Sequence, residues 1–539
     1  MTGGEALVAA LANHSVDTIF GIPGTHNLAV YAALPRYGIT HVLTRHEQGA
    51  GYAADGYART TGRPGIVLTT TGPAILNAAA SAAQAYSDSV PVLFISPGMP
   101  LGHPGLGNGL LHEVKNQGAA LAAVVSYSHR VTSVAEIPLA VAQAFATMSE
   151  GRPRPVHLEI PLDLLDEVAD VAMVPKIPFG TRDAPGVSVA DAAAALNAAS
   201  RPLILVGGGA SRAAEQVTAV AEVLLAPVIA TATGKGILSE GHELAVGAGV
   251  QHPSVVDAVN DSDMILAIGT ELSPADWWLG LPDLTGKLVR IDIDATSINT
   301  NAVPTHGLIG DAATVLTSLL PLLDVKSNGH GSSGSDTGRV SELRLSFAAD
   351  ARAEGAPWLE IVAAIGAALP RDAIVAADSA MACYYGALSN LPLHRPNAFL
   401  YPSGGGTLGF GLPAGIGAKV ASPQTPVLVL QGDGGIMFTI AELATAAELG
   451  IALPIVVVDN GGYGEIYAEM VDRKEPAHAV ALGHVDFPAL AASLGCYGVA
   501  IDNPAELTAA IVSAFTADRP TVLHILEQSR VAESLRWTR

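Results

Sequence analysis

Two oxygen-bearing side chains end neighbouring apolar stretches in the last third of the chain. Asp433 follows PVLVLQG, and Asn460 ends the next stretch, LPIVVVDN. One helix-like segment separates them, so parallel pairing would bring both side chains to the carboxyl edge of one sheet, where ligands bind in such folds. Carboxylate, amide and carbonyl oxygens suit Mg²⁺, and Gly462 could supply the carbonyl. The spacing predicts a divalent cation that holds a diphosphate.

Two glycines directly after Asp433 fit the same chemistry. Gly434 and Gly435 would let the backbone approach a phosphate, with N–H groups at a helix N-terminus. A plain βα turn also uses Asp and Gly for its geometry, and GDGG alone would favour that interpretation. The second stretch, which ends in DNGGYG, shifts the balance toward a metal and diphosphate site.

A third candidate, Glu47, lies in THVLTRHEQGAGYAADGYAR (40–59), where an apolar strand turns into a helix rich in small residues. An acidic side chain in a first helical turn complements exposed N–H groups and the positive end of the helix dipole. On this stretch alone, capping is the favoured interpretation of Glu47. A chemical role is the alternative, and the small residues after it would then leave room for a cofactor and a partner subunit.

The elements that must position these residues alternate between strand and helix along the whole chain. Continuous apolar strands separated by Ala-rich helices predict parallel sheets that are covered on both faces. The expected fold class is therefore α/β. The predicted strands are GIVLTT (65–70), PVLFIS (91–96), PLILVGGG (202–209), MILAIG (264–269), LVRIDID (288–294), AIVAAD (373–378), PVLVLQGD (426–433) and LPIVVVDN (453–460).

Two breaks divide the chain. Residues 155–186 form a Pro-punctuated connector, and residues 324–339 form a Gly/Ser-rich linker of the flexible type. The breaks predict three units, 1–165, 186–324 and 340–539. The first and third units have similar patterns, which hints at an internal duplication.

Composition excludes several classes of protein. The 539 residues carry a net charge of −22 and no basic stripe, which argues against a nucleic-acid partner. The two cysteines, Cys383 and Cys496, form no disulfide framework and fit a reducing compartment. The first residues lack the basic start of a signal peptide, and no apolar run reaches membrane-spanning length. We expect a cytoplasmic protein without a membrane partner.

These residues lie in motifs that resemble the acetolactate synthase/pyruvate decarboxylase superfamily. GDG followed at this distance by Asn resembles the thiamine-diphosphate motif, and the resemblance covers the whole chain. A narrower resemblance, to the 5-guanidino-2-oxopentanoate decarboxylase-like group, rests on GLGNGLLHEVKNQ, RHEQGAG and NGGYGEI. The superfamily motifs are FGIPGTHNLAVYAAL, TRHEQGAGYAADGYAR, TTTGPAILNAAASAAQAYSDSVPVLFIS, RPRPVHLEIPLD and SGGGTLGFGLPAGIGA.

The resemblance implies three doubly wound parallel-sheet domains. They would be a pyrimidine-binding domain (1–165), a middle Rossmann-like domain (186–324) and a diphosphate-binding domain (340–539). The implied cofactors are thiamine diphosphate and Mg²⁺. The active site would form between the first unit of one subunit and the third unit of another, so a homodimer is the minimum and a homotetramer is expected.

The resemblance also assigns roles. Glu47 would hydrogen-bond the aminopyrimidine ring of the cofactor and promote deprotonation of the thiazolium carbon, which makes capping the minor interpretation. Leu408 would wedge the cofactor into its bent shape, and the carbonyl of Gly406 would accept from the pyrimidine. The implied Mg²⁺ ligands are Asp433, Asn460 and the Gly462 carbonyl, with Gly434 and Gly435 at the diphosphate.

Four further residues rank below these. His26 and His112 are candidates to move protons and to stabilise developing alkoxide charge. Asn77 would lie on a loop near the thiazolium, and Ser379 near the diphosphate or the substrate.

Two features depart from acetolactate synthases or narrow the substrate. Those enzymes bind FAD in the middle domain and have an Arg where this chain has Glu271, in GTELSPADWW; a carboxylate there would repel a diphosphate, so the sequence argues against FAD. After the metal loop, Glu465, Glu469 or Asp472 could bind a guanidinium bidentately. A solvated helix face is the favoured interpretation of these three carboxylates.

The sequence therefore predicts non-oxidative decarboxylation of a 2-oxo acid, in which the product is released as an aldehyde or joined to a second carbonyl. An acetolactate synthase acting on pyruvate is the alternative within the superfamily. A Rossmann-type oxidoreductase, or a non-catalytic relative, is the alternative from another class.

Overall fold

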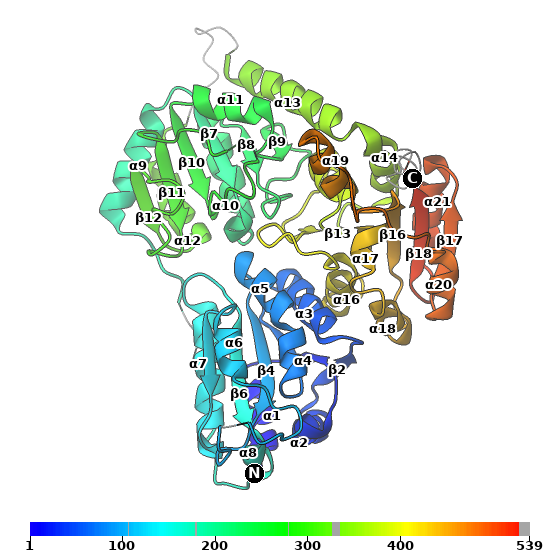
Figure 1. Cartoon of the computed structure of the whole chain (residues 1–539). Helices are drawn as coiled ribbons and strands as arrows, with labels where there is room; N and C mark the ends of the chain where they lie inside the picture. The colour runs from blue at the N-terminus through cyan, green and yellow to red at the C-terminus, as the bar shows by residue number, and fades with distance from the viewer. Residues whose placement is uncertain (106, 178–179, 279, 326–334, 528–539) are drawn as a thin grey trace.

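The computed structural model describes residues 1–105, 107–177, 180–278, 280–325 and 335–527. The chain folds into three α/β units, each built around its own six-stranded sheet (Figure 1). Most of the predicted linker and the last residues of the third unit lie outside the described residues. Within the described part, no helix is long and apolar enough to cross a membrane.

The first unit contains a parallel sheet of strand order β2-β1-β3-β4-β6-β5. Its strands are β1 (Thr18–Gly21), β2 (Thr40–Leu43), β3 (Gly65–Leu68), β4 (Val92–Gly98), β5 (Tyr127–Arg130) and β6 (Val156–Pro161). Its helices are α1 (Gly3–Asn13), α2 (Leu28–Ala33), α3 (Glu47–Thr61), α4 (Pro73–Asn77), α5 (Ala79–Ser87), α6 (Gln117–Ala122), α7 (Ile137–Ser149) and α8 (Leu162–Asp166).

The middle unit has the sheet order β12-β11-β10-β7-β8-β9, which is the doubly wound order of dinucleotide-binding folds. Its strands are β7 (Pro202–Val206), β8 (Val228–Ala230), β9 (Ala245–Ala248), β10 (Met264–Ile268), β11 (Leu288–Asp292) and β12 (His306–Ile309). Its helices are α9 (Gly186–Ala198), α10 (Ala214–Leu224), α11 (Pro253–Asp261) and α12 (Ala312–Leu319).

The third unit has the sheet order β14-β13-β15-β16-β18-β17. Its strands are β13 (Ile374–Ala377), β14 (Phe399–Leu400), β15 (Val427–Gly432), β16 (Pro454–Asp459), β17 (Tyr497–Ile501) and β18 (Thr521–Leu526). Its helices are α13 (Ser335–Glu354), α14 (Leu359–Ala368), α15 (Leu388–Asn390), α16 (Gly411–Ala421), α17 (Asp433–Ile436), α18 (Glu442–Glu448), α19 (Gly464–Asp472), α20 (Phe487–Ser493) and α21 (Pro504–Ala514).

The first and third sheets share one topology. Numbered within its own unit, each sheet runs second, first, third, fourth, sixth, fifth, and every strand pair is parallel. The central strands are buried on both faces, as their continuous apolar sequences predict. The predicted α/β class is confirmed, and the duplication holds at the level of strand order.

Helices α3 and α16 join the first unit to the third, and Figure 1 shows them side by side between the two sheets. Glycines allow this approach. A Cβ on Gly56 would clash with the carbonyl of Ala414, and a Cβ on Gly417 would clash with the carbonyl of Ala53. Helix α16 of the same chain therefore packs against the small residues that follow Glu47, a contact that the sequence did not indicate.

Gly417→Ala tests this contact. Alanine has a higher helix propensity than glycine by about 1 kcal/mol, but overpacking against a rigid backbone costs about 1–3 kcal/mol. The clash therefore outweighs the propensity, and the free energy of unfolding should fall. We expect a lower melting temperature by calorimetry. The control is Gly102→Ala, where a Cβ meets nothing within 4 Å and no change is expected. Equal melting temperatures for both variants would contradict the close approach.

Candidate active site

The carboxyl edge of the first sheet holds Glu47 at the first position of α3. The helix is capped by the preceding residue, because the His46 side chain accepts a hydrogen bond from the Gln48 N–H at 3.1 Å. The Glu47 carboxylate is directed elsewhere: its Oε2 accepts from Asn77 Nδ2 at 3.0 Å. Among the described residues, no backbone N–H of the first turn of α3 donates to the Glu47 carboxylate. The cap is made by His46 instead.

The two predicted histidines lie together at the same edge. Their rings meet edge to face at a centroid distance of 5.1 Å, and His26 Nδ1 is 3.0 Å from the Thr71 hydroxyl. Burial and then the neighbouring His112 ring lower the pKa of His26. The segment after β3 connects the histidines to Glu47. Its loop carries Thr71, which contacts His26, and α4 then ends at Asn77, which contacts Glu47. We call Glu47, Asn77, His26 and His112 the first-unit rim.

The carboxyl edge of the third sheet brings the predicted metal ligands together. Asp433 begins α17 directly after β15, and Asn460 directly follows β16. The backbone N–H groups of Gly434 and Asn460 interact with the Asp433 carboxylate. The Asn460 amide oxygen accepts from the Gly462 N–H at 3.0 Å, which folds the turn after β16 back onto the edge.

These residues fit a divalent cation. Asp433 is 6 % exposed and forms no ion pair among the described residues. Burial and then the nearby Asp459 carboxylate raise the pKa of Asp433 to about 6. A cation would relieve both effects. The described residues contain no group of three or more His, Cys, Asp or Glu that could hold a metal ion, so a cation at this edge would need amide, carbonyl and phosphate oxygens to complete its shell.

A buried carboxylate, Asp378, organises the rest of this edge. Its two oxygens accept from the backbone N–H groups of Ser379, Gly409 and Phe410 and from the Gln431 amide, at 2.6–3.2 Å. Burial raises its pKa, and the donors oppose that effect. The sequence pointed only to the residue after it, since one Asp at a strand end carries no signal of four donors.

The residues around Asp378 are those expected near the cofactor. A Cβ on Gly435 would stand 2.7 Å from the Asp378 carboxylate and 3.7 Å from the Leu408 side chain. Gly406 has a φ of 58° and stands close to the Ser379 hydroxyl. We call the group made by Asp433, Asn460, Gly462, Gly434, Gly435, Ser379, Gly406 and Leu408 the third-unit rim.

Glu442 links the third unit to the start of α3. It lies on α18 and is 1 % exposed, and its carboxylate accepts from the backbone N–H groups of Arg45 and His46, each at 3.0 Å. The Thr445 hydroxyl adds a third hydrogen bond at 2.6 Å. Glu442 thus holds the two residues that precede Glu47. A lone acidic residue on an apolar helix was the only sequence signal for it.

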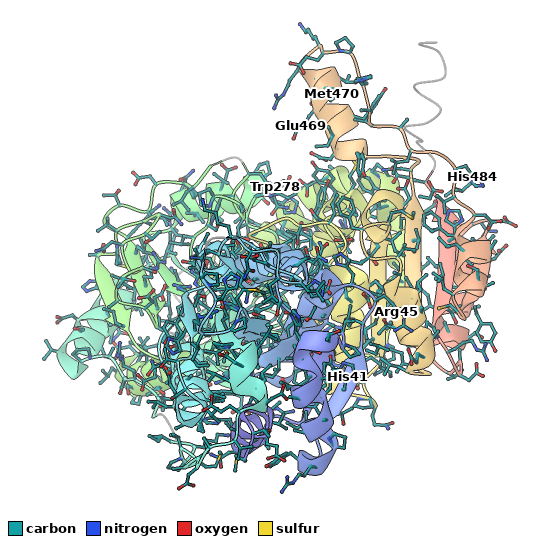
Figure 2. The ribbon with its side chains drawn as sticks, turned by 60° about the horizontal axis from the view of Figure 1, so that its bottom comes forward. His41, Arg45, Trp278, Glu469, Met470 and His484 are labelled. Atoms are coloured by element: carbon teal, nitrogen blue, oxygen red, sulfur yellow. The ribbon has the colours of Figure 1, made fainter. Side chains whose placement is uncertain are left out.

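The three carboxylates considered for a guanidinium separate into two kinds. Glu469 and Asp472 are exposed on α19, which stands out from the body of the protein in Figure 2. Glu465 is turned inward and accepts from the hydroxyls of Tyr384 and Tyr385 at 3.2 and 2.9 Å. The solvated-face interpretation therefore describes Glu469 and Asp472 but not Glu465.

Glu271, the residue that argued against FAD, is not an isolated negative charge. Its carboxylate forms ion pairs with Arg152 at 2.8 Å and Arg154 at 3.5 Å. Two arginines from the first unit therefore compensate the negative charge on which the sequence argument against FAD depended.

Comparison with known proteins identifies the class to which this fold and these rims belong. Residues 1–120 match the N-terminal TPP binding domain of thiamine pyrophosphate enzymes, residues 189–319 match the central domain, and residues 380–525 match the C-terminal TPP binding domain. The chain belongs to the thiamine pyrophosphate enzyme family. The interpretation as a Rossmann-type oxidoreductase is thereby set aside.

Among individual relatives, the chain is 41 % identical to the Probable 2-ketoarginine decarboxylase AruI of Pseudomonas aeruginosa, over 94 % of this chain and 90 % of the relative. It is 32 % identical to the Probable acetolactate synthase large subunit of Methanocaldococcus jannaschii, over 98 % and 92 %. It is 30 % identical to the Acetolactate synthase isozyme 1 large subunit of Escherichia coli, over 97 % and 93 %. The predicted superfamily is confirmed.

Glu442→Ala tests the link to α3. The change removes the acceptor of the partly buried Arg45 and His46 N–H groups, and a hydrogen bond to a charged group contributes about 1.5–3 kcal/mol. We expect a lower melting temperature and faster hydrogen exchange at these two amides.

Glu448→Ala is the matched control, because Glu448 lies on the same helix and pairs with the same residue, the Arg45 side chain, at 2.6 Å but at the surface. Exposed pairs contribute less than about 1 kcal/mol. Faster exchange at Arg45 and His46 in both variants, or in neither, would contradict the assignment.

Proposed function

We propose that this chain is a thiamine-diphosphate- and Mg²⁺-dependent enzyme that decarboxylates a 2-oxo acid with a cationic side chain, 2-ketoarginine (5-guanidino-2-oxopentanoate). The observation that carries the proposal is the 41 % identity to a relative named as a probable 2-ketoarginine decarboxylase over almost the whole chain. The two rims support it, because every residue type that the chemistry needs lies at a sheet edge.

The bound cofactor would supply a carbon nucleophile that attacks the keto carbon and accepts the electrons left by carbon dioxide. Glu47 is assigned to share a proton with the pyrimidine ring, and its hydrogen bond to Asn77 orients the carboxylate for this task. The Asp433 carboxylate, the Asn460 amide oxygen and the Gly462 carbonyl are assigned to Mg²⁺. Gly434 and Gly435 are assigned to the diphosphate.

Leu408 is assigned to wedge the cofactor into its bent shape, the Gly406 carbonyl to accept from the pyrimidine, and Ser379 to the diphosphate or the substrate. His26 and His112 are the proton carriers. Because the pKa of His26 is lowered, its ring is neutral near pH 7 and can accept a proton or donate a hydrogen bond to developing negative charge. The paired rings give the site two nitrogen groups within reach of one substrate.

The proposal includes a second copy of the chain. Within one chain, no hydrogen bond or ion pair among the described residues joins the first-unit rim to the third-unit rim. Large apolar side chains are exposed beside both rims: Leu111 is 58 % exposed next to His112, and Phe438 is 52 % exposed just after α17. A homodimer that joins the two rims would cover them. A homotetramer would be a pair of such dimers.

The remaining predictions stand as parts of this proposal. The domains are taken as 1–165, 186–324 and 340–539. The buried, free thiols of Cys383 and Cys496 support a reducing compartment such as the cytoplasm.

Acetolactate synthesis from pyruvate is the second candidate function. It is supported by the relatives at 30–32 % identity that are named acetolactate synthases.

A substrate panel separates the two candidates. We expect carbon dioxide and 4-guanidinobutanal from 2-ketoarginine, with kcat/KM at least about 100-fold above that for pyruvate, since discrimination by a charged group is worth several kcal/mol. Acetolactate from pyruvate as the main product would instead favour the second candidate.

Glu47→Gln and Asp433→Ala test the assigned roles. Glu47→Gln should retain thiamine diphosphate but lose turnover by at least about 100-fold, because an amide cannot exchange the proton. Asp433→Ala should lose Mg²⁺-dependent retention of the cofactor on gel filtration. The surface variant Glu469→Gln is the control. Decarboxylation retained in both site variants would refute the assignments.

Mixing the two inactive variants tests whether the site is shared. If each site takes Glu47 from one subunit and Asp433 from the other, a hybrid dimer has one intact site. Random reassembly after mild dissociation should then restore roughly a quarter of wild-type activity, since half of the dimers are hybrids with one site each. A site contained in one chain predicts no recovery.

A further inference from the structure

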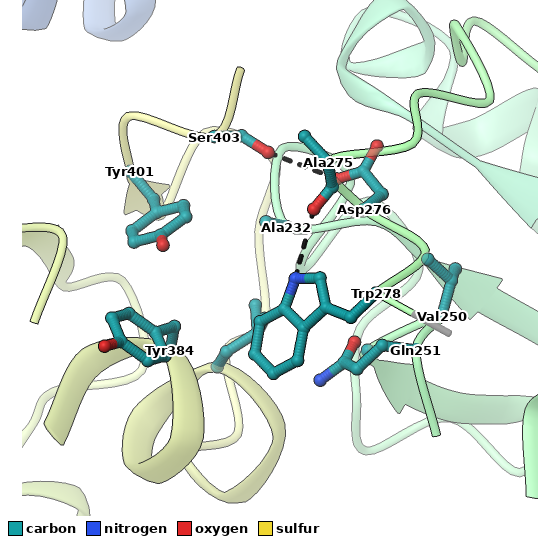
Figure 3. A pocket seen from close by; sticks show the side chains of 11 residues that line it. Ala232, Val250, Gln251, Ala275, Asp276, Trp278, Tyr384, Tyr401 and Ser403 are labelled. Carbon is teal, nitrogen blue, oxygen red and sulfur yellow. Dashed lines mark hydrogen bonds between the residues drawn. The ribbon is translucent and has the colours of Figure 1, made fainter. Parts of the chain in front are cut away.

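A pocket lies between the middle and third units, outside both rims. Its polar and aromatic lining comes from the loop after β10, from the loop after β9, from the segment before α15 and from the chain after β14 (Figure 3). Those lining residues are Gln251, Asp276, Trp278, Tyr384, Tyr401 and Ser403. No role assigned above uses it.

Aromatic rings form one side of this pocket. Trp278 is 44 % exposed, although it packs edge to face on Tyr384 and Tyr385 at centroid distances of 6.0 and 5.3 Å. Its indole N–H donates to the Ala275 carbonyl at 3.1 Å, which fixes the ring. In Figure 3, Tyr384 and Tyr401 lie on one side of the indole and Asp276 above it. A fixed, partly uncovered indole face attracts cations.

Asp276 is the acidic group of the pocket. Its Oδ1 accepts from the Ser403 hydroxyl at 3.1 Å, and no arginine or lysine among the described residues pairs with it. Glu271, five residues earlier, is held by two arginines. Burial, opposed by the Ser403 hydrogen bond and assisted by Asp88 and Glu271, raises the pKa of Asp276 to about 7. No described cation compensates this carboxylate, so a bound cation would stabilise its charged form.

We propose that this pocket binds the guanidinium group of the substrate, with the Asp276 carboxylate as its counter-ion and the Trp278 indole as its stacking surface. The inference rests on the proposed function, which supplies a 2-oxo acid with a guanidinium. A guanidinium is planar, so it can stack on an indole while its N–H groups reach a carboxylate in the same plane. An ammonium group has the charge but lacks the flat face.

The pocket lies next to the third-unit rim. One substrate could therefore place its guanidinium in the pocket and its 2-oxo acid group at the rim. Tyr401 lines the pocket, and its hydroxyl interacts with the side chain of Ser379, which belongs to that rim. Tyr384 also lines the pocket and donates to Glu465 at the start of α19. The contact between Tyr401 and Ser379 thus joins the pocket to the rim.

Glu465 is the competing carboxylate, and its contacts assign it another task. Both of its oxygens accept tyrosine hydroxyls, from Tyr385 and Tyr384. These hydrogen bonds fix the two rings against Trp278. Glu465 is therefore a positioning residue for the aromatic wall, whereas Asp276 keeps an oxygen that is not used by the Ser403 hydroxyl.

The kinetic test compares 2-ketoarginine with 5-ureido-2-oxopentanoate, a neutral analogue of nearly the same shape. In the holoenzyme, kcat/KM for 2-ketoarginine divided by kcat/KM for the ureido analogue measures recognition of the positive charge. Asp276→Asn should lower this ratio by about 10- to 100-fold, the value of a hydrogen bond to a charged group. Trp278→Leu should lower it by about 3- to 30-fold. Glu469→Gln, an exposed carboxylate nearby in sequence to Glu465, should leave it unchanged.

Binding of n-propylguanidinium to the holoenzyme, measured by calorimetry, tests the pocket without turnover. Wild type should bind it, Asp276→Asn should bind it at least about 10-fold more weakly, and n-propylurea should not compete. Absence of binding to wild type, or equal binding to Asp276→Asn, would overturn the inference. The inference would also be overturned if Glu465→Gln lowered the kcat/KM ratio while Asp276→Asn kept the wild-type ratio.

The two proposals fail differently. If wild type binds n-propylguanidinium through Asp276 but releases no carbon dioxide from 2-ketoarginine, the proposed function fails and the cation pocket remains. If wild type decarboxylates 2-ketoarginine and Asp276→Asn keeps the wild-type ratio, the function stands and the pocket assignment fails.

Discussion

The close packing of α3 against α16 is the constraint on which the candidate site depends. The helices meet backbone to backbone because Gly56 and Gly417 lack side chains. Since protein interiors are packed to high density, neither unit can shift along this contact without opening a void. Glu442 then holds the N–H groups that precede α3. Glu47 consequently starts a helix that two units fix in place, and its carboxylate is oriented by a third element that carries Asn77.

The enclosed carboxylates of this protein differ in how many donors and cations compensate their charge. Burial penalises a charge unless donors or cations compensate it. Asp378 and Glu442 receive their donors from the chain itself, so they organise loops and helix ends. Asp433 is buried and Asp276 is partly buried, both with little compensation, and desolvation raises the pKa of each. The proposed Mg²⁺ ion at Asp433 and the proposed guanidinium at Asp276 would each supply a compensating positive charge.

The fold was predictable because its signals are local. Continuous apolar strands and the GDGG and DNGGYG turns predicted parallel sheets with Asp433 and Asn460 at one edge, and the sheet order agrees. Interpretations that depended on distant partners were weaker. The Glu47 carboxylate is oriented by Asn77, which lies 30 residues later, and the charge of Glu271 is compensated by arginines that lie more than a hundred residues earlier. Neither contact leaves a trace in the stretch where the residue itself is found.

By itself, the sequence determined the α/β class, the repeated strand-and-helix pattern and the residue types at two sheet edges, because periodicity and turn chemistry act over a few residues. The tertiary structure decided which of these residues meet. It joined His26 to His112 across one unit, Glu442 to the start of α3 across two, and Asp276 to the aromatic wall of Trp278 and Tyr384 between the middle and third units. The physical reason is that these contacts form only when elements distant in the sequence pack together, and their geometry depends on how closely those elements can approach.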